Sequence, residues 1–419
     1  VVLFKDCHSW FLVDILPPDD HAPVLGLAID IGTTRMVMNL VDLESGDILG
    51  ETGFDNPQAV IGPDVLARIH HSNQPGGAGA LQQVVIDAVN RAMDDLCCSH
   101  GRSAAQIYLI TGAGNTAMTH LFAGIEAFQI IKEPYIPCVN ILDTLPASDL
   151  GLAANPSAQL FLFPNIGSYF GGDLIAGILA ANLDKREEPA IMVDVGTNAE
   201  IVVGSSDWLI ACAGAAGPAL EGGVSRMGMT AGPGVVDRVW VDPDTSEIRV
   251  HTIEEQPAVG ICGSGMIDLA AALFLSGRID IRGKFVKSAC GDQLVEKDEI
   301  GHFILVDHDR SGTGEPIGLS QVDLNSLTSS KAAMYTILEV IVRHTAGLEF
   351  EDLSRFYVAG TFGSFIDPHS AIGIGMLPDI PVETFEVLGN TSLGGATRLL
   401  TEPDAFDRIM DIRQSITYI

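Results

Sequence analysis

Two short segments of this 419-residue chain repeat one arrangement of chemically useful side chains. Each segment ends an apolar run with an aspartate, turns at a glycine and continues with hydroxyl or amide side chains; the members are Asp30, Gly32, Thr33 and Thr34, then Asp194, Gly196, Thr197 and Asn198. The glycine lets the backbone turn tightly and approach a ligand, while hydroxyl and backbone N–H groups donate to phosphate oxygens. An aspartate oxygen suits Mg²⁺, here through a water molecule. Two copies therefore predict a pair of phosphate hairpins that hold the β- and γ-phosphates of a nucleotide, with Mg²⁺ at Asp30 and Asp194.

A glycine-rich turn late in the chain offers a third contact. Gly360, Thr361 and Gly363 follow the apolar run at residues 356–359. Taken alone, this segment is an ordinary turn between a strand and a helix. After two phosphate hairpins, the missing side chains at two positions predict a place where a flat ring or a ribose lies against the backbone. The turn is therefore predicted to contact the adenosine of a bound nucleotide.

Three further groups stay open between two interpretations. Asp173 opens an apolar helix just before the second hairpin, so it is either the N-cap of that helix or a carboxylate that faces the cleft and orients the attacking water. Gly217 and Glu221 lie in a loop that opens a helix, where N–H groups can face phosphate. They either contact nucleotide, ribose or metal, or form a plain helix entry. Gly263 and Ser264 have the same two interpretations.

Similar secondary structure is expected after each hairpin copy. A second strand follows the hairpin, and a helix then leads to a strand that ends in glycine; the ranges are 36–43 with 107–114, and 199–203 with 356–363. Apolar residues at helical spacing predict long helices over 81–98 and 331–346. Alternating strands and helices indicate α/β architecture. The tandem repeat indicates two lobes of one design with a ligand cleft between them.

This order of two phosphate hairpins and a late adenosine turn resembles the actin-like ATPase superfamily, which contains sugar and acetate kinases, heat-shock chaperones and actin. The resemblance implies a two-lobed α/β fold of duplicated ribonuclease H-like lobes, with the nucleotide in the cleft between the lobes. Further segments are similar to the ATP-dependent reductive activators of corrinoid proteins, and they are residues 56–58, 62–65, 68–69, 114–121, 260–268, 331–333 and 388–396.

On this resemblance the chain divides into four parts. Residues 1–23 are expected to be an extended connector from a missing N-terminal region. Residues 24–185 are expected to form the first ATPase lobe and residues 186–365 the second. Residues 366–419 are expected to be a C-terminal segment that can pack back on the first lobe.

The resemblance implies an enzyme that couples ATP hydrolysis to the return of an inactive Co(II) corrinoid protein to Co(I) for methyl transfer. Its partners would be the corrinoid protein and a low-potential electron donor, its cofactor would be Mg-ATP, and activators of this type are often homodimers. The family also uses an iron–sulfur module, but the seven cysteines of this chain lack cluster spacing. We therefore expect an iron–sulfur cluster only in a region missing from this chain. Electron transfer would then depend on that region, or else this member receives electrons from elsewhere.

Two other functions share every nucleotide motif. A small-molecule kinase of the same superfamily would transfer the γ-phosphate to a hydroxyl or a carboxylate, and a phosphorylated product would reveal it. A reactivating chaperone for a cobalamin enzyme would use the same ATPase to exchange damaged cofactor, and it would need no reductant.

The overall composition excludes several classes of protein. With 54 acidic and 23 basic residues, the chain has a formal charge of −31 at pH 7, which repels the phosphates of nucleic acids. Hydrophobic residues make up 47% of the chain, enough for folded domains. No apolar run approaches the roughly 18 residues that span a bilayer, so no membrane span is predicted. An odd number of cysteines without paired spacing indicates reduced thiols in a cytoplasmic protein.

Overall fold

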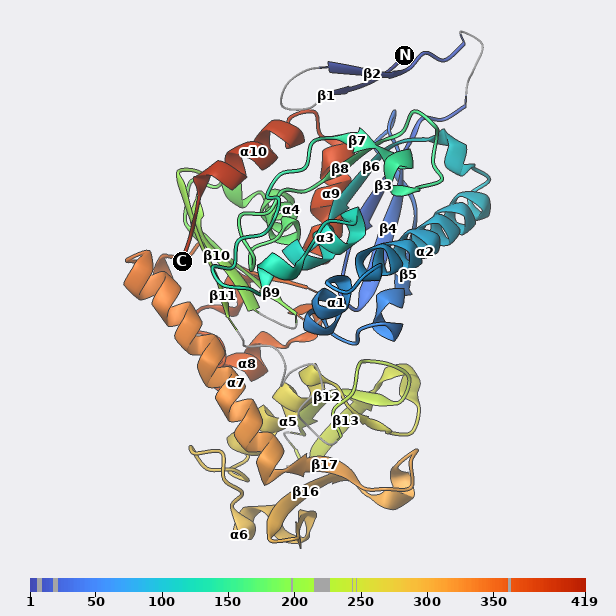
Figure 1. Ribbon diagram of the computed structural model, residues 1–419. Helices are drawn as coiled ribbons and strands as arrows, with labels where there is room; N and C mark the ends of the chain where they lie inside the picture. Colours follow the sequence, from blue (N-terminus) through green and yellow to red (C-terminus); the bar gives the residue numbers. More distant parts are fainter. Residues whose placement is uncertain are drawn as a thin grey trace. The chain divides into compact units, whose positions relative to one another are not determined.

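The chain divides into two compact units. The computed structural model describes residues 1–5, 10–17, 22–196, 199–214, 227–242, 244–245, 247–360 and 363–419. The first unit contains Val1–Glu187, Ser205–Leu209 and Asn390–Ile419, and the second contains Glu188–Gly204 and Ile210–Gly389. The backbone therefore passes from one unit to the other more than once (Figure 1).

The first unit is built on a mixed six-stranded sheet. Its strands, in spatial order, are β5 (Ile48–Asp55), β4 (Arg35–Asp42), β3 (Leu25–Asp30), β6 (Ile107–Ala113), β8 (Gln159–Leu162) and β7 (Leu145–Pro146). β3 is antiparallel to β4, which is antiparallel to β5, whereas β3, β6 and β8 run parallel. The first predicted phosphate hairpin is therefore the turn between the central strand β3 and its neighbour β4.

Alternate residues of β3 point to opposite faces of this sheet, as expected for a strand. Leu25, Leu27 and Ile29 join a buried cluster with side chains of α2 and α3. On the other face, a side chain at Gly26 would lie 3.0 Å from a methyl group of Leu400 on α9. The sheet thus lies between two helical layers (Figure 1), and the helices are α1 (Val65–Ser72), α2 (Gly77–Ser99) and α3 (Thr116–Ala123), then α4 (Gly172–Ala181), α9 (Thr391–Thr401) and α10 (Ala405–Ser415).

The sheet of the second unit repeats this design. Its strands lie in the order β19 (Phe385–Gly389), β18 (Arg355–Ala359), β9 (Ala190–Val195), β10 (Ala199–Ser205) and β11 (Trp208–Gly214). β9 is antiparallel to β10 and parallel to β18, just as β3 is antiparallel to β4 and parallel to β6. The two hairpins that share a sequence pattern therefore occupy equivalent places in two sheets of one topology.

Two smaller sheets and further helices complete the second unit. One sheet contains β13 (Ile248–Thr252), β12 (Val235–Val241) and β14 (Gly260–Ile261), and the other contains β15 (Leu294–Lys297), β16 (Ile300–Val306) and β17 (Ile317–Ser320). The helices of this unit are α5 (Gly263–Leu275), α6 (Lys287–Cys290), α7 (Gln321–Glu339) and α8 (Pro368–Gly373). Among the described residues, no helix has both the length and the apolar composition needed to cross a bilayer.

Both long helices are present, with different starting points. The range 81–98 falls inside α2, where Leu81, Val85, Ala88 and Leu96 are buried. The predicted start at residue 331 is wrong, because α7 begins ten residues earlier and continues into a π-helical turn at Val340–Thr345. The helix begins at a capping box. The residues of this box are polar, so the spacing of apolar residues does not predict where the helix starts.

The two ends of the chain carry additional structure in the first unit. Within residues 1–23, β1 (Val2–Lys5) and β2 (Trp10–Asp14) form an antiparallel ribbon. The ring of Phe4 lies 6.3 Å from that of Phe406 on α10. β20 (Ile416–Tyr418) ends the chain. Of the expected C-terminal segment, residues 366–389 belong to the second unit and residues 390–419 to the first.

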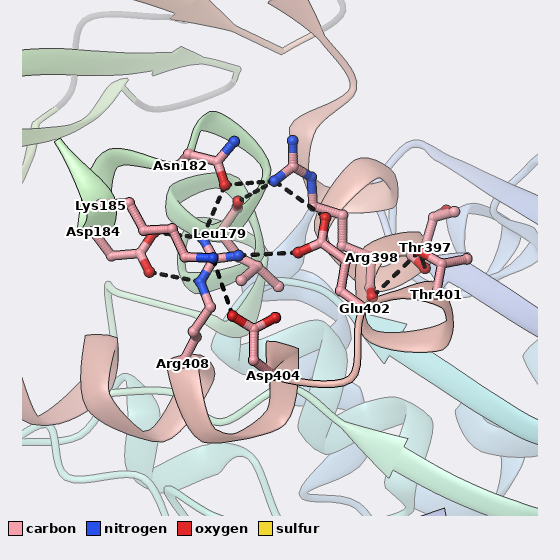
Figure 2. A network of polar contacts seen from close by, with 10 residues as sticks. All are labelled: Leu179, Asn182, Asp184, Lys185, Thr397, Arg398, Thr401, Glu402, Asp404 and Arg408. Atoms are coloured by element: carbon pink, nitrogen blue, oxygen red, sulfur yellow. Dashed lines mark hydrogen bonds and ion pairs between the residues drawn. The ribbon is translucent and has the colours of Figure 1, made fainter. Parts of the chain in front are cut away.

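A polar cluster joins the carboxyl ends of α4 and α9 to α10 in the first unit (Figure 2). The buried guanidinium of Arg408 donates two hydrogen bonds of 2.8 Å to the carboxylate of Asp184 and one of 3.0 Å to Glu402. Asn182 accepts from Arg408 at 3.0 Å and from Arg398 at 2.6 Å. Since the charges are paired inside the fold, this cluster fixes the C-terminal helices against the residues that precede the second unit.

Candidate functional site

The first hairpin is held by side chains from several elements. Gly32 lies where an added Cβ would meet the carbonyl oxygen of Arg35, so the turn requires glycine. Asn56 donates a hydrogen bond of 2.8 Å to the carbonyl oxygen of Gly32. Asn115 donates to the hydroxyl of Thr33 at 3.1 Å, and the carbonyl oxygen of Thr34 accepts from a backbone N–H at 2.8 Å. The predicted phosphate-binding turn is therefore preorganised by protein contacts.

Arg68 is the buried cation of this hairpin. Its guanidinium donates to the carbonyl oxygens of Gly62 and Thr33, each at 2.8 Å, and only 1% of the residue is exposed. Burial lowers the pKa of Arg68, and the carboxylate of Asp64 opposes that effect. The sequence places Arg68 in a segment that resembles the family, but its contact with the hairpin at Thr33 follows only from the fold.

Asp30 ends β3 and is joined to the C-terminal part of the chain. Its Oδ2 accepts a hydrogen bond of 2.8 Å from the side-chain amide of Asn390. Burial raises the pKa of the Asp30 carboxyl, and hydrogen bonds from Asn390 and Ser392 act in the opposite direction. The amide and the hydroxyl therefore favour the charged carboxylate that a Mg²⁺ site needs. Sequence reasoning missed Asn390, although an asparagine just before a helix is a common N-cap.

Asp173 lies in the first turn of α4, in the same unit as the first hairpin. The N-cap of α4 is Gly171, so the interpretation of Asp173 as N-cap is wrong. The backbone N–H of Asp173 donates to the carbonyl oxygen of Gly114 at 3.2 Å. An added Cβ at Gly171 would lie 2.7 Å from the backbone nitrogen of Thr116. α4 therefore begins against the turn whose Asn115 holds Thr33.

The second unit places Asp194 beside a glycine of the predicted adenosine turn. Asp194 pairs with Ala359 across the parallel strands β9 and β18. Gly360 follows Ala359 with φ of +86°, and an added Cβ there would lie 2.6 Å from Oδ1 of Asp194. Gly196 directly follows β9. The structure thus brings together Asp194 and Gly360, which the sequence assigned to different parts of the nucleotide.

Several predicted residues add less to this arrangement. A Cβ at Gly363 would lie 2.7 Å from a methyl group of Val358. α5 begins at Gly263, and the buried hydroxyl of Ser264 donates to the carbonyl oxygen of Asp237 at 3.1 Å. The helix-entry interpretation of Gly263 and Ser264 is therefore confirmed, whereas their contact with nucleotide stays a prediction. The remaining candidates lie outside the described residues, and they are Thr197, Asn198, Gly217, Glu221 and Thr361.

A buried carboxylate of the second unit was not predicted to matter. Asp268 on α5 is 5% exposed and accepts a hydrogen bond from the backbone N–H of Val239 at 3.2 Å. Burial raises the pKa of Asp268, a hydrogen bond from Ser370 opposes that rise, and the carboxylate of Asp367 adds to it. The sequence marks the segment that contains Asp268 only by its resemblance to the family, because burial of a single acid has no sequence signature.

The oxygen chemistry at the two hairpins fits Mg²⁺. Within the described ranges, no three side chains of the His, Cys, Asp and Glu types gather closely enough to form a metal site of their own. A Mg²⁺ that binds with nucleotide usually keeps several waters and takes one or two carboxylates plus phosphate oxygens. Asp30 and Asp194 each end a central strand beside a glycine turn, and their carboxylates are ligands of that kind.

The described cysteines are free thiols, and two of them are unreactive by environment. Burial raises the pKa of Cys97 to about 11, and the neighbouring Cys98 and Asp94 add to the rise. Burial also raises the pKa of Cys212 to about 11. Because the thiolate is the nucleophile and the metal ligand, these two side chains are packing residues.

Comparison with known proteins identifies the relatives of this arrangement. The family model of the RACo middle region matches residues 25–186, and that of the C-terminal domain of RACo, the ASKHA domain, matches residues 188–419. The corrinoid activation enzyme RamQ of Eubacterium limosum is 30% identical over 404 residues, which are 94% of this chain and 67% of RamQ. The [Co(II) methylated amine-specific corrinoid protein] reductase of Methanosarcina barkeri is 26% identical over 424 residues, with 94% of this chain and 73% of the reductase covered.

A solved structure gives the same result for the fold. The reductive activator for corrinoid, iron-sulfur protein superposes with a TM-score of 0.85 at 36% identity, over 100% of this chain and 66% of that protein. This confirms the predicted actin-like ATPase fold. The chain spans about two thirds of the length of these relatives. It belongs to the RACo family, and its C-terminal part is the ASKHA domain of that family.

Proposed function

We propose that this chain is the ATPase portion of a reductive activator that uses ATP to return an inactive Co(II) corrinoid protein to Co(I). The observation that carries the proposal is the pair of equivalent hairpins, each with an aspartate at the end of a central strand. Family membership directs this nucleotide chemistry to corrinoid proteins, because the two relatives named above act on corrinoid proteins.

The hairpin residues would bind and orient the nucleotide. Backbone N–H and hydroxyl groups of the first hairpin would donate to phosphate oxygens, and those of the second hairpin would do the same. Asp30 and Asp194 would hold Mg²⁺ through water, and the ion would neutralise phosphate charge. Asp173 would orient the attacking water. The backbone around Gly360 would accept the adenosine, since a side chain there is excluded.

Hydrolysis supplies free energy but no electron. The reduction is Co(II) plus one electron to Co(I), and the electron must come from a low-potential one-electron donor outside this chain. For such a couple, 59 mV corresponds to a tenfold change in the equilibrium. ATP can raise the yield of Co(I) only if the nucleotide states of the activator differ in affinity for the Co(II) and Co(I) partner. Binding of Mg-ATP to the hairpin residues is the proposed source of that difference.

The first test measures ATP hydrolysis by this chain with and without a Co(II) corrinoid protein, under a low-potential reductant, while the cobalt absorption spectrum is followed. Partner-stimulated hydrolysis with ATP-dependent appearance of Co(I) is expected. An equal rate of hydrolysis with and without the partner, together with no formation of Co(I), would overturn the proposal. A phosphorylated small molecule would then indicate the kinase, and partner reactivation without reductant would indicate the chaperone.

A further inference from the structure

Asn390 is held at two ends. Its Oδ1 accepts a hydrogen bond of 2.9 Å from the backbone N–H of Leu393 and so caps α9. Its Nδ2 donates the bond of 2.8 Å to Oδ2 of Asp30, which is 360 residues away in the sequence. A side-chain amide has one acceptor and one donor end, and the helix cap requires the acceptor end. The donor end must therefore face Asp30, since a flipped amide would lose both bonds.

Contacts along the whole length of α9 fix the position of Asn390, which caps this helix. The hydroxyl of Thr111 on β6 donates to the carbonyl oxygen of Ala396 at 2.8 Å, and Asn39 on β4 donates to the hydroxyl of Thr397 at 3.2 Å. The far end of the helix enters the cluster around Arg408, where Arg398 donates to Asn182 (Figure 2). A side chain carried by such a helix has little freedom to follow Asp30, so it constrains the carboxylate.

The chain connection gives this contact a second consequence. Gly389, the last residue of the second unit, accepts a hydrogen bond of 3.0 Å from the backbone N–H of Gly360. The next residue, Asn390, is the first of the returning first unit and binds Asp30. One peptide bond therefore connects a residue tied to the predicted adenosine turn with a residue tied to the first hairpin.

We infer that Asn390 is a positioning residue, whose amide fixes the orientation of the Asp30 carboxylate for Mg-nucleotide while its oxygen caps α9. The inference rests on the proposed nucleotide site at Asp30. It assigns no chemical step to Asn390, which acts through Asp30. The role is distinct from helix capping, because serine would keep the cap but would be too short to reach Asp30.

The test compares binding of Mg-ADP by calorimetry in the wild-type chain, Asn390→Ser and Thr397→Val. Asn390→Ser should keep the thermal midpoint but bind Mg-ADP about tenfold more weakly, as expected for one lost hydrogen bond to a charged group. Thr397→Val is the matched control on the same helix. It removes the partner of Asn39 and should lower the thermal midpoint while Mg-ADP affinity stays unchanged.

A double-mutant cycle asks whether Asn390 acts through Asp30. Asp30→Asn alone should weaken Mg-ADP binding, and adding Asn390→Ser should change the affinity by no more than about twofold. In a steady-state ATPase assay, Asn390→Ser should show a lower kcat for ATP hydrolysis than the wild-type chain. Equal affinity in wild type and Asn390→Ser, or losses that add fully in the double variant, would overturn the inference.

Failure of the inference and failure of the proposed function can be told apart. Binding is measured without any corrinoid protein, so an Asn390 effect without Co(I) formation sustains the inference and removes the activator function. If Asn390→Ser leaves Co(I) formation unaffected, the activator function is sustained and the inference about Asn390 is overturned. Absence of Mg-ADP binding by the wild-type chain would overturn both.

Discussion

The two hairpins share a sequence pattern and a place in the fold, yet they are supported differently. The first is held by polar side chains from other elements, with Arg68 and Asn115 bonded to Thr33, and Asn390 bonded to Asp30. At the second, the contact that the structure describes is the close approach of Gly360 to Asp194. Among the described contacts, the first hairpin is thus marked by side-chain hydrogen bonds and the second by the close approach of a glycine.

This difference shows how a duplicated unit can specialise. A hairpin anchored by buried hydrogen bonds has a defined geometry before ligand arrives, because each lost bond would leave a buried polar group unpaired. A hairpin that abuts glycine backbone keeps room for a ligand group close to its aspartate. We therefore expect the first hairpin to respond mainly to loss of its anchors and the second to any gain of side-chain volume.

Removal of either aspartate should have the largest effect on ATP turnover. This effect should depend least on how the two hairpins are supported. Asp30→Ala and Asp194→Ala should each lower Mg-ATP turnover by at least about tenfold, because each removes a carboxylate that is proposed to hold the metal. Circular dichroism should show an intact fold in both variants. Unchanged turnover in both would refute the assignment of two phosphate hairpins.

These aspartates were within reach of sequence reasoning because a strand end, a glycine and a hydroxyl are local features. Two α/β lobes of one design were predicted for the same reason, from repeated short segments, and the actin-like fold was implied by the resemblance that these segments carry. Asn390 and Arg68 were not assigned roles, since their contacts with Asp30 and Thr33 join positions far apart in the chain. Distant contacts of this kind follow from the fold and leave no spacing in the sequence.

The alternative interpretations of Asp173 show a second limit. An acid at the start of an apolar helix fits an N-cap, but the N-cap lies two residues earlier, at Gly171, and the helix begins at Gly172. Close packing of Gly171 against the turn at Asn115 sets that boundary. Helix starts governed by tertiary packing rather than by capping chemistry are not encoded in local pattern.

The two buried arginines of the first unit provide a sharper test of the anchored hairpin. Arg68→Met should lower the free energy of unfolding by about 3 kcal/mol, because two buried carbonyl oxygens lose their donor. It should also lower turnover per folded molecule by about fivefold, since the hairpin carbonyl at Thr33 is released. Urea titration and a steady-state ATPase assay measure the two effects.

Arg408→Met is the matched control for that prediction. It leaves the carboxylate of Asp184 without its cation, whereas Glu402 keeps its ion pair with Arg398, and it should cost about 3 to 5 kcal/mol of stability. Its cluster does not contact the hairpin in the described structure. Turnover per folded molecule should therefore match wild type. Equal turnover in the two arginine variants would mean that Arg68 stabilises the fold without positioning the hairpin.

The smallest effect is expected from a single methyl group at the second hairpin. Gly360→Ala must adopt φ of +86° and place its Cβ near the Asp194 carboxylate, whereas Gly347→Ala adopts φ of +69° with no neighbour within 4 Å. Backbone strain should cost both variants about 1 kcal/mol of stability. Any difference in turnover between them then reports the contact of the added methyl group with Asp194. Gly360→Ala alone should lower turnover, by about threefold, because its Cβ would displace the Asp194 carboxylate. If both alanine variants turn over Mg-ATP alike, the close approach of Gly360 to Asp194 does not define the second hairpin, and the distinction between the two supports fails.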